Sequence, residues 1–198
     1  HRTTMWWLHG TSISSYLLRR RRQRRRQRRL LAAPELRQQP PARRRQHKPP
    51  SPPVPAFFNA EKLGPAATAA ARSAFASAYP YTYVQLADLL DDTRLRAVRQ
   101  ELSKLHRTFK ETDLFKVYQT GDLGNLDRSD PTHAAALPQT LALRDALYSD
   151  AFRAFVRRVT GCAPLTGQTD CSCNVYARGS HLLCHDDVIG TRCVSYIL

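Results

Sequence analysis

Apolar residues recur at helical spacing along three stretches of the chain. After the capping residues 91–93, they fall three, four and three positions apart, at Leu95, Val98, Leu102 and Leu105. A similar pattern starts at Pro138 and again at Ser149 or Asp150, and Gly161 follows the last stretch as a C-cap. Each stretch has one apolar face, so the pattern predicts three amphipathic helices.

Residues rich in β-branched and aromatic side chains form five shorter segments that we expect to be strands. These are residues 81–86, 113–123, 171–176, 182–184 and 192–198. The Ala-rich residues 66–78 are either a helix or part of a linker. The chain ends inside the last apolar segment, so we expect the backbone groups and the apolar face of this strand to lack a partner that follows it.

Basic residues are very unevenly distributed along the 198 residues. Residues 1–55 carry fifteen Lys or Arg against the single acid Glu35, whereas residues 56–198 carry sixteen against fifteen acids. The tail contains the run RRRRQRRRQRR and a proline-rich stretch, with too little apolar surface to offset chain entropy. We therefore expect a disordered tail (1–58), a linker or helix (59–80) and a folded region (81–198).

The arginine-rich run in this tail admits three interpretations. It is a solvated or mistranslated leader, a signal for the nucleus or nucleolus that can also contact RNA or the ribosome, or a cleaved organelle transit peptide. We expect localisation in the nucleus and cytoplasm, with the transit peptide left open. The near-neutral remainder does not resemble a nucleic-acid-binding domain, whose basic residues spread over a folded face.

Five cysteines lie within the last 37 residues, at Cys162, Cys171, Cys173, Cys184 and Cys193. Their odd number and the lack of a clean secretory signal argue for reduced thiols in a reducing compartment. The longest membrane-span candidate, residues 6–18, is interrupted by a histidine, a glycine and three serines. We therefore expect no membrane partner.

The most informative residues are His185 and Asp187 in the segment Leu-Leu-Cys-His-Asp-Asp. On an extended strand, residues two apart project to the same side, so these two can grip one ion while Asp186 points away. One imidazole and one carboxylate are two arms of the facial triad that holds non-haem Fe(II). The third arm, a distant histidine, is expected after the end of the chain.

Tyr176 lies nine residues before His185, with Gly179 between them, and a hairpin could bring its phenol beside the metal strand. Together with residues 100–104 (QELSK) and 113–119 (DLFKVYQ), the segment LLCHDD carries a resemblance. Residues 81–198 resemble the amino-terminal part of the prolyl 3,4-dihydroxylase family, ribosomal prolyl hydroxylases associated with translation termination and stress granules. The spacing from Tyr176 also resembles that of the wider prolyl 4-hydroxylases.

The resemblance implies an α+β fold with a double-stranded β-helix (jelly-roll) oxygenase core and supporting helices, truncated after the first core strands. It implies a dioxygenase that uses Fe(II), 2-oxoglutarate, O2 and L-ascorbate to hydroxylate a prolyl residue of a protein substrate, with a small-subunit ribosomal protein as the expected partner. It assigns His185 and Asp187 to iron and Tyr176 to 2-oxoglutarate. The family's second iron histidine and 2-oxoglutarate arginine have no counterpart within the chain, so we expect it to be inactive alone.

Two other functions compete with this interpretation. The first is a small zinc module built from Cys171, Cys173, Cys184 and either His181 or His185, although paired C-x2-4-C knuckles are absent. The second is a non-enzymatic RNA-binding protein that acts through its arginine-rich tail. The remaining histidines of the folded region, His106 and His133, together with His181 itself, are expected to be ordinary surface or turn residues.

Overall fold

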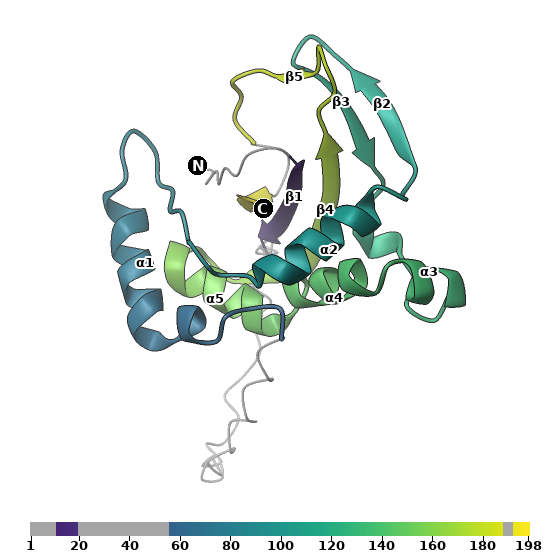
Figure 1. Cartoon of the computed structure of the whole chain (residues 1–198). Coiled ribbons are helices and arrows are strands. Elements are labelled where there is room, and N and C mark those ends of the chain that lie inside the picture. Colours follow the sequence, from purple (N-terminus) through teal and green to yellow (C-terminus); the bar gives the residue numbers. More distant parts are fainter. Residues whose placement is uncertain (1–10, 20–55, 188–191) are drawn as a thin grey trace, which may run out of the picture.

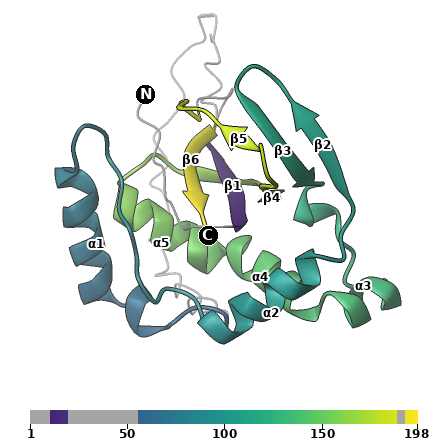
Figure 2. The same ribbon diagram turned by 45° about the horizontal axis from the view of Figure 1, so that its top comes forward.

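The protein has a layer of helices on one side of a single antiparallel sheet (Figure 1). The computed structural model describes residues 11–19, 56–187 and 192–198, and of residues 11–19 the backbone alone. Viewed from a tilted angle, the sheet lies above α5, α4 and α2, with α1 at one edge (Figure 2). Among the described residues, no helix is long and apolar enough to span a membrane.

The predicted helices are confirmed. Asp91 caps α2 by accepting from the Arg94 N–H, and Ser149 caps α5 by accepting from the Phe152 N–H. Gly161 ends α5 in the left-handed region, with φ +66°. The helices are α1 (Pro65–Ser77), α2 (Asp92–Leu102), α3 (Pro131–Ala136), α4 (Pro138–Leu147) and α5 (Asp150–Thr160), with 3-10 turns at Glu61–Leu63 and Leu123–Asn125.

The sheet has the order β2-β3-β4-β1-β6, with β5 also paired to β3. Its strands are β1 (Thr11–Arg19), β2 (Arg107–Glu111), β3 (Phe115–Thr120), β4 (Leu165–Val175), β5 (His181–Leu182) and β6 (Arg192–Ile197). Strands expected near 113–123, 171–176 and 192–198 are confirmed as β3, β4 and β6.

Local composition misleads at two segments, one predicted to be a strand and one not predicted, and the reason is the same. Residues 81–86 are not a strand, because Tyr81 and Tyr83 remain exposed and the segment pairs with no described strand. In contrast, β2 was missed because its RTFKE sequence has no apolar alternation and is almost wholly exposed. It forms because it pairs with β3 in a hairpin, from Arg107 opposite Thr120 to Glu111 opposite Lys116. Pairing across strands, not local composition, decides both cases.

The amino-terminal region contributes to the sheet and to the core. Strand β1 lies between β4 and β6 and pairs antiparallel with both, so the expected disorder of residues 1–58 is wrong for this strand. The segment TSISSYLL is rich in β-prone residues, which the average composition of the tail concealed. The arginine-rich residues 20–55 lie outside the described residues.

The hydrophobic core lies between the helix layer and the sheet and extends to residue 57. Phe152 on α5 stacks on Phe58, with ring centroids 4.9 Å apart, and meets Tyr196 on β6 edge to face at 5.2 Å. Phe57 and Phe75 are also buried in this cluster. Residues 57–77 therefore belong to the same core as residues 81–198 and are not a linker.

Two carboxylates tie neighbouring elements together. Glu101 on α2 is 8% exposed and accepts from the backbone N–H groups of Gln139 and Thr140 and from the Thr140 hydroxyl, at 2.7–3.0 Å. It thereby caps the start of α4, which has no side-chain cap of its own. Asp122 accepts from the Tyr148 hydroxyl at 2.8 Å and from the Cys171 N–H on β4 at 3.1 Å.

The architecture is α+β, as expected from the sequence. Helices and one antiparallel sheet account for the regular structure of the described residues. The double-stranded β-helix, which requires a second sheet facing the first, remains a prediction.

Candidate metal centre

The segment that contains His185 and Asp187 leaves the sheet at its β3 edge. Strand β5 pairs with β3, with Leu182 opposite Phe115, and the Leu183 N–H continues this pairing by donating to the Leu114 carbonyl at 2.9 Å. Beyond this point residues 183–187 have no strand geometry. The expectation that His185 and Asp187 lie on a continuous strand is therefore wrong, because β5 is only two residues long.

His185 and Asp187 nevertheless converge. The His185 Nε2 atom lies 3.3 Å from the Asp187 Oδ1 atom, and Asp187 is only 9% exposed, whereas Asp186 is exposed. This is the arrangement that the sequence predicted, with the two candidate ligands together and Asp186 pointing elsewhere. The two side chains therefore meet on a loop and not on a strand.

The tautomer of His185 follows from its second contact. Its Nδ1 atom lies 2.8 Å from the Leu183 carbonyl oxygen, which can only accept. In the neutral imidazole Nδ1 therefore carries the proton and Nε2 presents its lone pair toward Asp187. A ring held in this way by a backbone carbonyl is typical of metal-binding histidines.

Arg192 is a third member of the site that the sequence did not reveal. Its Nη1 atom donates to the Asp187 backbone oxygen at 3.1 Å and lies 3.5 Å from the Asp187 Oδ1 atom. Arg192 opens β6, so the contact ties the loop to a second strand. No motif signals this role, because an arginine five residues after an aspartate has no pattern of its own.

The donor set fits part of an iron site. A facial triad requires two imidazoles and one carboxylate, and His185 with Asp187 supplies one of each. Within the described ranges no group of three His, Cys, Asp or Glu residues could hold a metal. His133 has the ordinary role expected of it, since its Nδ1 accepts from the Asp127 N–H at 3.1 Å.

Tyr176 follows β4 and precedes the turn to β5. The turn is closed by the Ser180 N–H, which donates to the Ala177 carbonyl at 2.9 Å, and contains Gly179 at φ +83°. Strands β4 and β5 both pair with β3 and not with each other, so the hairpin expected to bring Tyr176 beside the segment of His185 does not form. The structure gives no contact between Tyr176 and His185 or Asp187 among the described residues, so its 2-oxoglutarate role remains a prediction.

The cysteines do not assemble the zinc module that competed with this site. Cys171 and Cys173 are each 1% exposed and face the hydrophobic core, whereas Cys184 is exposed. The described residues contain no group of three possible metal ligands that includes these cysteines. The zinc hypothesis is therefore contradicted within the described part of the chain.

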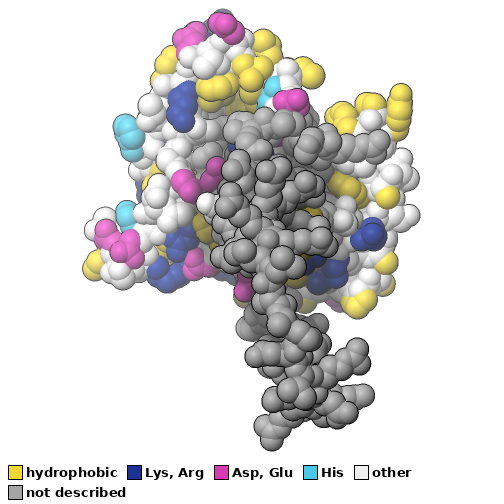
Figure 3. All heavy atoms as spheres, turned by 180° about the vertical axis from the view of Figure 1, so that it is seen from behind, with side chains coloured by type: hydrophobic (Ala, Val, Ile, Leu, Met, Phe, Trp, Pro, Cys, Tyr) yellow, Lys and Arg dark blue, Asp and Glu magenta, His cyan; other side chains and the backbone are white. Residues whose placement is uncertain are grey.

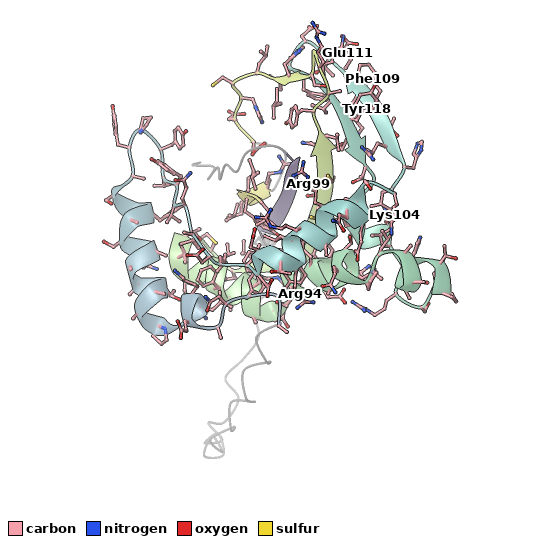
Figure 4. The ribbon with its side chains drawn as sticks, viewed as in Figure 1. Arg94, Arg99, Lys104, Phe109, Glu111 and Tyr118 are labelled. Atoms are coloured by element: carbon pink, nitrogen blue, oxygen red, sulfur yellow. The ribbon has the colours of Figure 1, made fainter. Side chains whose placement is uncertain are left out.

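The hairpin beside the site has an aromatic surface. Phe109 and Tyr118 are paired across β2 and β3, with centroids 5.1 Å apart, and both are more than one third exposed. Figure 4 shows them at the outer end of the hairpin, above Arg99 on α2 and Lys104 in the turn after it. In the view from behind, hydrophobic side chains gather at the same end of the molecule (Figure 3). Exposed Leu114 and Leu183 belong to the neighbouring strand ends.

Known proteins resemble this chain over slightly more than half its length. Prolyl 3,4-dihydroxylase OGFOD1 of Ostreococcus tauri is 56% identical over 120 residues, which are 60% of this chain and 23% of the relative. The resemblance to the prolyl 3,4-dihydroxylase family is thereby confirmed. Prolyl 3-hydroxylase OGFOD1 of Mus musculus is 35% identical over 104 residues, covering 52% of this chain and 17% of the relative.

A Xenopus laevis prolyl 3-hydroxylase OGFOD1 is 33% identical over a match of the same length. No family model matches the chain. The chain spans less than a quarter of the length of these prolyl hydroxylases. Their whole-protein activity is therefore carried to this chain only as a proposal.

Proposed function

We propose that this chain supplies two iron ligands of an Fe(II)- and 2-oxoglutarate-dependent dioxygenase that hydroxylates a prolyl residue of a protein. The observation that carries the proposal is the convergence of His185 Nε2 and Asp187 Oδ1 at 3.3 Å in a chain similar to prolyl hydroxylases. A neutral imidazole and a carboxylate match the ligand chemistry of non-haem Fe(II).

Each residue of the site has a distinct task. Asp187 offers a carboxylate that is shielded from water, and His185 offers Nε2 because the Leu183 carbonyl holds the proton on Nδ1. Arg192 positions the Asp187 backbone from β6. Iron, when bound, supplies the activation of dioxygen that amino-acid side chains cannot perform.

The proposal requires further groups besides His185 and Asp187, and some of them come from outside the described residues. A second histidine completes the triad, and an arginine binds the far carboxylate of 2-oxoglutarate. Tyr176 donates from its phenol to the same co-substrate, and L-ascorbate maintains the metal in its reduced state. These expectations come from the family resemblance.

Metal binding can be tested on the chain itself, even if a site with only two protein ligands binds the metal weakly. Mn(II) titrated into the isotope-labelled protein should broaden the NMR signals of residues 183–187. His185→Ala and Asp187→Ala should remove the broadening, whereas Asp186→Ala, on the exposed neighbour, should retain it. Broadening that persists in both ligand variants would place the metal elsewhere.

Activity is tested by a chimera, because the chain covers a small part of its relatives. The matched segment of the Ostreococcus tauri relative is replaced by that of this chain, and prolyl hydroxylation is measured as a gain of one oxygen coupled to succinate formation. The chimera should remain active, and His185→Ala or Asp187→Ala should abolish turnover. A folded but inactive chimera would contradict the proposal.

The substrate and location belong to the same proposal. We infer a ribosomal protein as the prolyl substrate, with the protein in the nucleus and cytoplasm. Support comes from the family resemblance and from the arginine-rich run in residues 20–55. This run would contact RNA or the ribosome, and deleting it should reduce ribosome association in a salt-dependent manner.

A further inference from the structure

Strand β2 forms one edge of the sheet. It comes first in the strand order β2-β3-β4-β1-β6 and pairs with β3 on one side, whereas its other side faces no described strand. Four of its five residues are exposed. The open edge of a strand presents unpaired backbone N–H and C=O groups, which a further strand can join.

The backbone groups at this open edge belong to alternate residues of β2. At the hairpin turn, the Thr112 N–H donates to the Phe115 carbonyl at 2.8 Å, so Thr112 directs its backbone groups toward β3. In antiparallel strands this direction alternates from one residue to the next. The residues that direct their N–H and C=O groups outward are therefore Arg107, Phe109 and Glu111.

The sequence of β2, RTFKE, is complementary to itself when a second copy runs antiparallel. A two-fold axis at Phe109 places the Phe109 residues of the two copies opposite each other. It also places Arg107 opposite Glu111 of the second copy, at both ends of the strand. Opposite charges and aromatic side chains are favourable cross-strand pairs. In the same register the outward-facing residues of the two copies meet, so that their backbone groups can bond to each other.

An exposed aromatic pair lies on this edge. Phe109 is 44% exposed and Tyr118 is 40% exposed, and neither ring belongs to the hydrophobic core. Figure 4 shows both residues near Glu111 at the outer end of the hairpin. In the two-fold arrangement the two Phe109 rings meet, with a Tyr118 ring beside each of them. Contact between the rings would remove apolar surface from water.

The two charged residues of the edge have capacity for a further partner. The Glu111 carboxylate is exposed and pairs with Lys116 at 3.1 Å, which leaves room for a second cation on its oxygens. The Nη2 atom of Arg107 donates to the Ser103 carbonyl at 2.6 Å, which anchors the start of β2. Its Nη1 atom has no hydrogen-bond partner among the described residues.

We propose that the open edge of β2 is a docking surface for a second copy of this chain, which continues the sheet across a two-fold axis. The charge pattern selects this occupant, because each copy presents the complement of the other. The interface consists of one strand edge and an aromatic cluster, so it is small. We expect a dimer with a dissociation constant of about 10–100 μM. The surface uses neither His185 nor Asp187, so its test is independent of the proposed metal site.

Sedimentation equilibrium of the full chain measures this association. Roughly 0.3 M salt is needed, because a net charge of +15 makes the copies repel each other. Glu111→Arg and Arg107→Glu should each abolish the dimer, because like charges then face each other at both ends of the strand. An equimolar mixture of the two variants should dimerise again, because each strand then faces the opposite charges of the other.

This restored dimer also shows that both variants are folded. Lys110→Glu has the same change of charge as Arg107→Glu, and Glu61→Arg has the same change as Glu111→Arg. Both controls should dimerise within about threefold of the wild-type affinity, because neither residue belongs to a charge pair across the axis. A mixture of the two edge variants that remains monomeric would overturn the proposal.

Amide hydrogen exchange tests the register without a substitution. The N–H groups of Phe109 and Glu111 should exchange about fivefold or more slowly at about 1 mM protein than in the dilute monomer. The N–H of Lys110, which faces β3, should be protected at both concentrations. Exchange at Phe109 that does not depend on concentration would contradict the pairing, as would oligomers larger than a dimer.

The aromatic contribution has its own matched pair of variants. Phe109→Ala should weaken the dimer by about tenfold, because the ring contact at the axis is lost. Tyr81→Ala should leave it unchanged, although Tyr81 and Tyr83 form another exposed aromatic pair, with centroids 5.7 Å apart. Equal effects of the two substitutions on sedimentation would place the interface away from β2.

Discussion

Buried carboxylates occupy two regions of this molecule and are used in opposite ways. Between α2 and α4, Glu101 accepts three hydrogen bonds at 2.7–3.0 Å, all from groups that the fold fixes. In the site loop, Asp187 is similarly buried, but among the described residues the nearest partners of its carboxylate lie at 3.3 and 3.5 Å. These distances exceed those of ordinary charge-assisted hydrogen bonds.

The difference shows how burial alone fails to distinguish a structural carboxylate from a ligand. Glu101 satisfies the start of α4, so its lone pairs serve the backbone. Asp187 lies between an imidazole and a guanidinium and keeps coordination capacity toward a cation. Variants that convert each carboxylate to its amide test this comparison directly.

The largest effect is expected for Glu101→Gln. The amide keeps one oxygen but turns an NH2 donor toward either the Gln139 N–H or the Thr140 N–H and hydroxyl, and removes the charge, which should lower the free energy of unfolding by about 3 kcal/mol. Urea unfolding measures this change. Glu111→Gln is the matched control, because Glu111 is paired with Lys116 at the surface and should change stability by less than about 1 kcal/mol. Equal losses of unfolding free energy in Glu101→Gln and Glu111→Gln would contradict the structural role given to Glu101.

Asp122→Asn should have the next largest effect. Asp122 joins the turn before α3, the end of α4 and β4 by accepting from Gly124, Tyr148 and Cys171. We expect a loss of about 2 kcal/mol, because all three donors share Oδ1, which the amide keeps without the negative charge that strengthens the bonds. Faster amide exchange at Cys171 in NMR would locate the damage on β4.

Tyr148→Phe removes one hydrogen bond from the same cluster and should cost about 1 kcal/mol. Burial, followed by the hydrogen bond to Asp122, raises the pKa of the Tyr148 phenol. The stabilising contribution is complete below the unfolded pKa of about 10 and is lost as pH rises toward the folded value. The wild-type protein should therefore lose stability above pH 10 more steeply than Tyr148→Phe, and a parallel pH dependence would contradict this.

The smallest change in stability is expected for Asp187→Asn. The amide oxygen can still accept from Arg192, so unfolding should shift by about 1 kcal/mol or less, while Mn(II) broadening at residues 183–187 should disappear. Asp186→Asn should change neither quantity. A loss as large as that of Glu101→Gln would show that Asp187 serves the fold.

The sequence by itself determined the elements whose signals are local. Caps at Asp91, Ser149 and Gly161 and the 3-4-3 apolar spacing define the helices because capping and one-sided burial act within a single element. The sequence also singled out His185 and Asp187 as a pair, and the structure brings their side chains together on a loop instead of the expected strand.

Only the tertiary structure decided the contacts between distant segments. Strand β1 lies within a tail whose average composition predicts disorder, and β2 lacks an apolar pattern, since cross-strand pairing forms both. Arg192 beside Asp187 and Glu101 at the start of α4 each join residues from separate elements. No periodicity encodes such meetings, because they depend on how the elements pack.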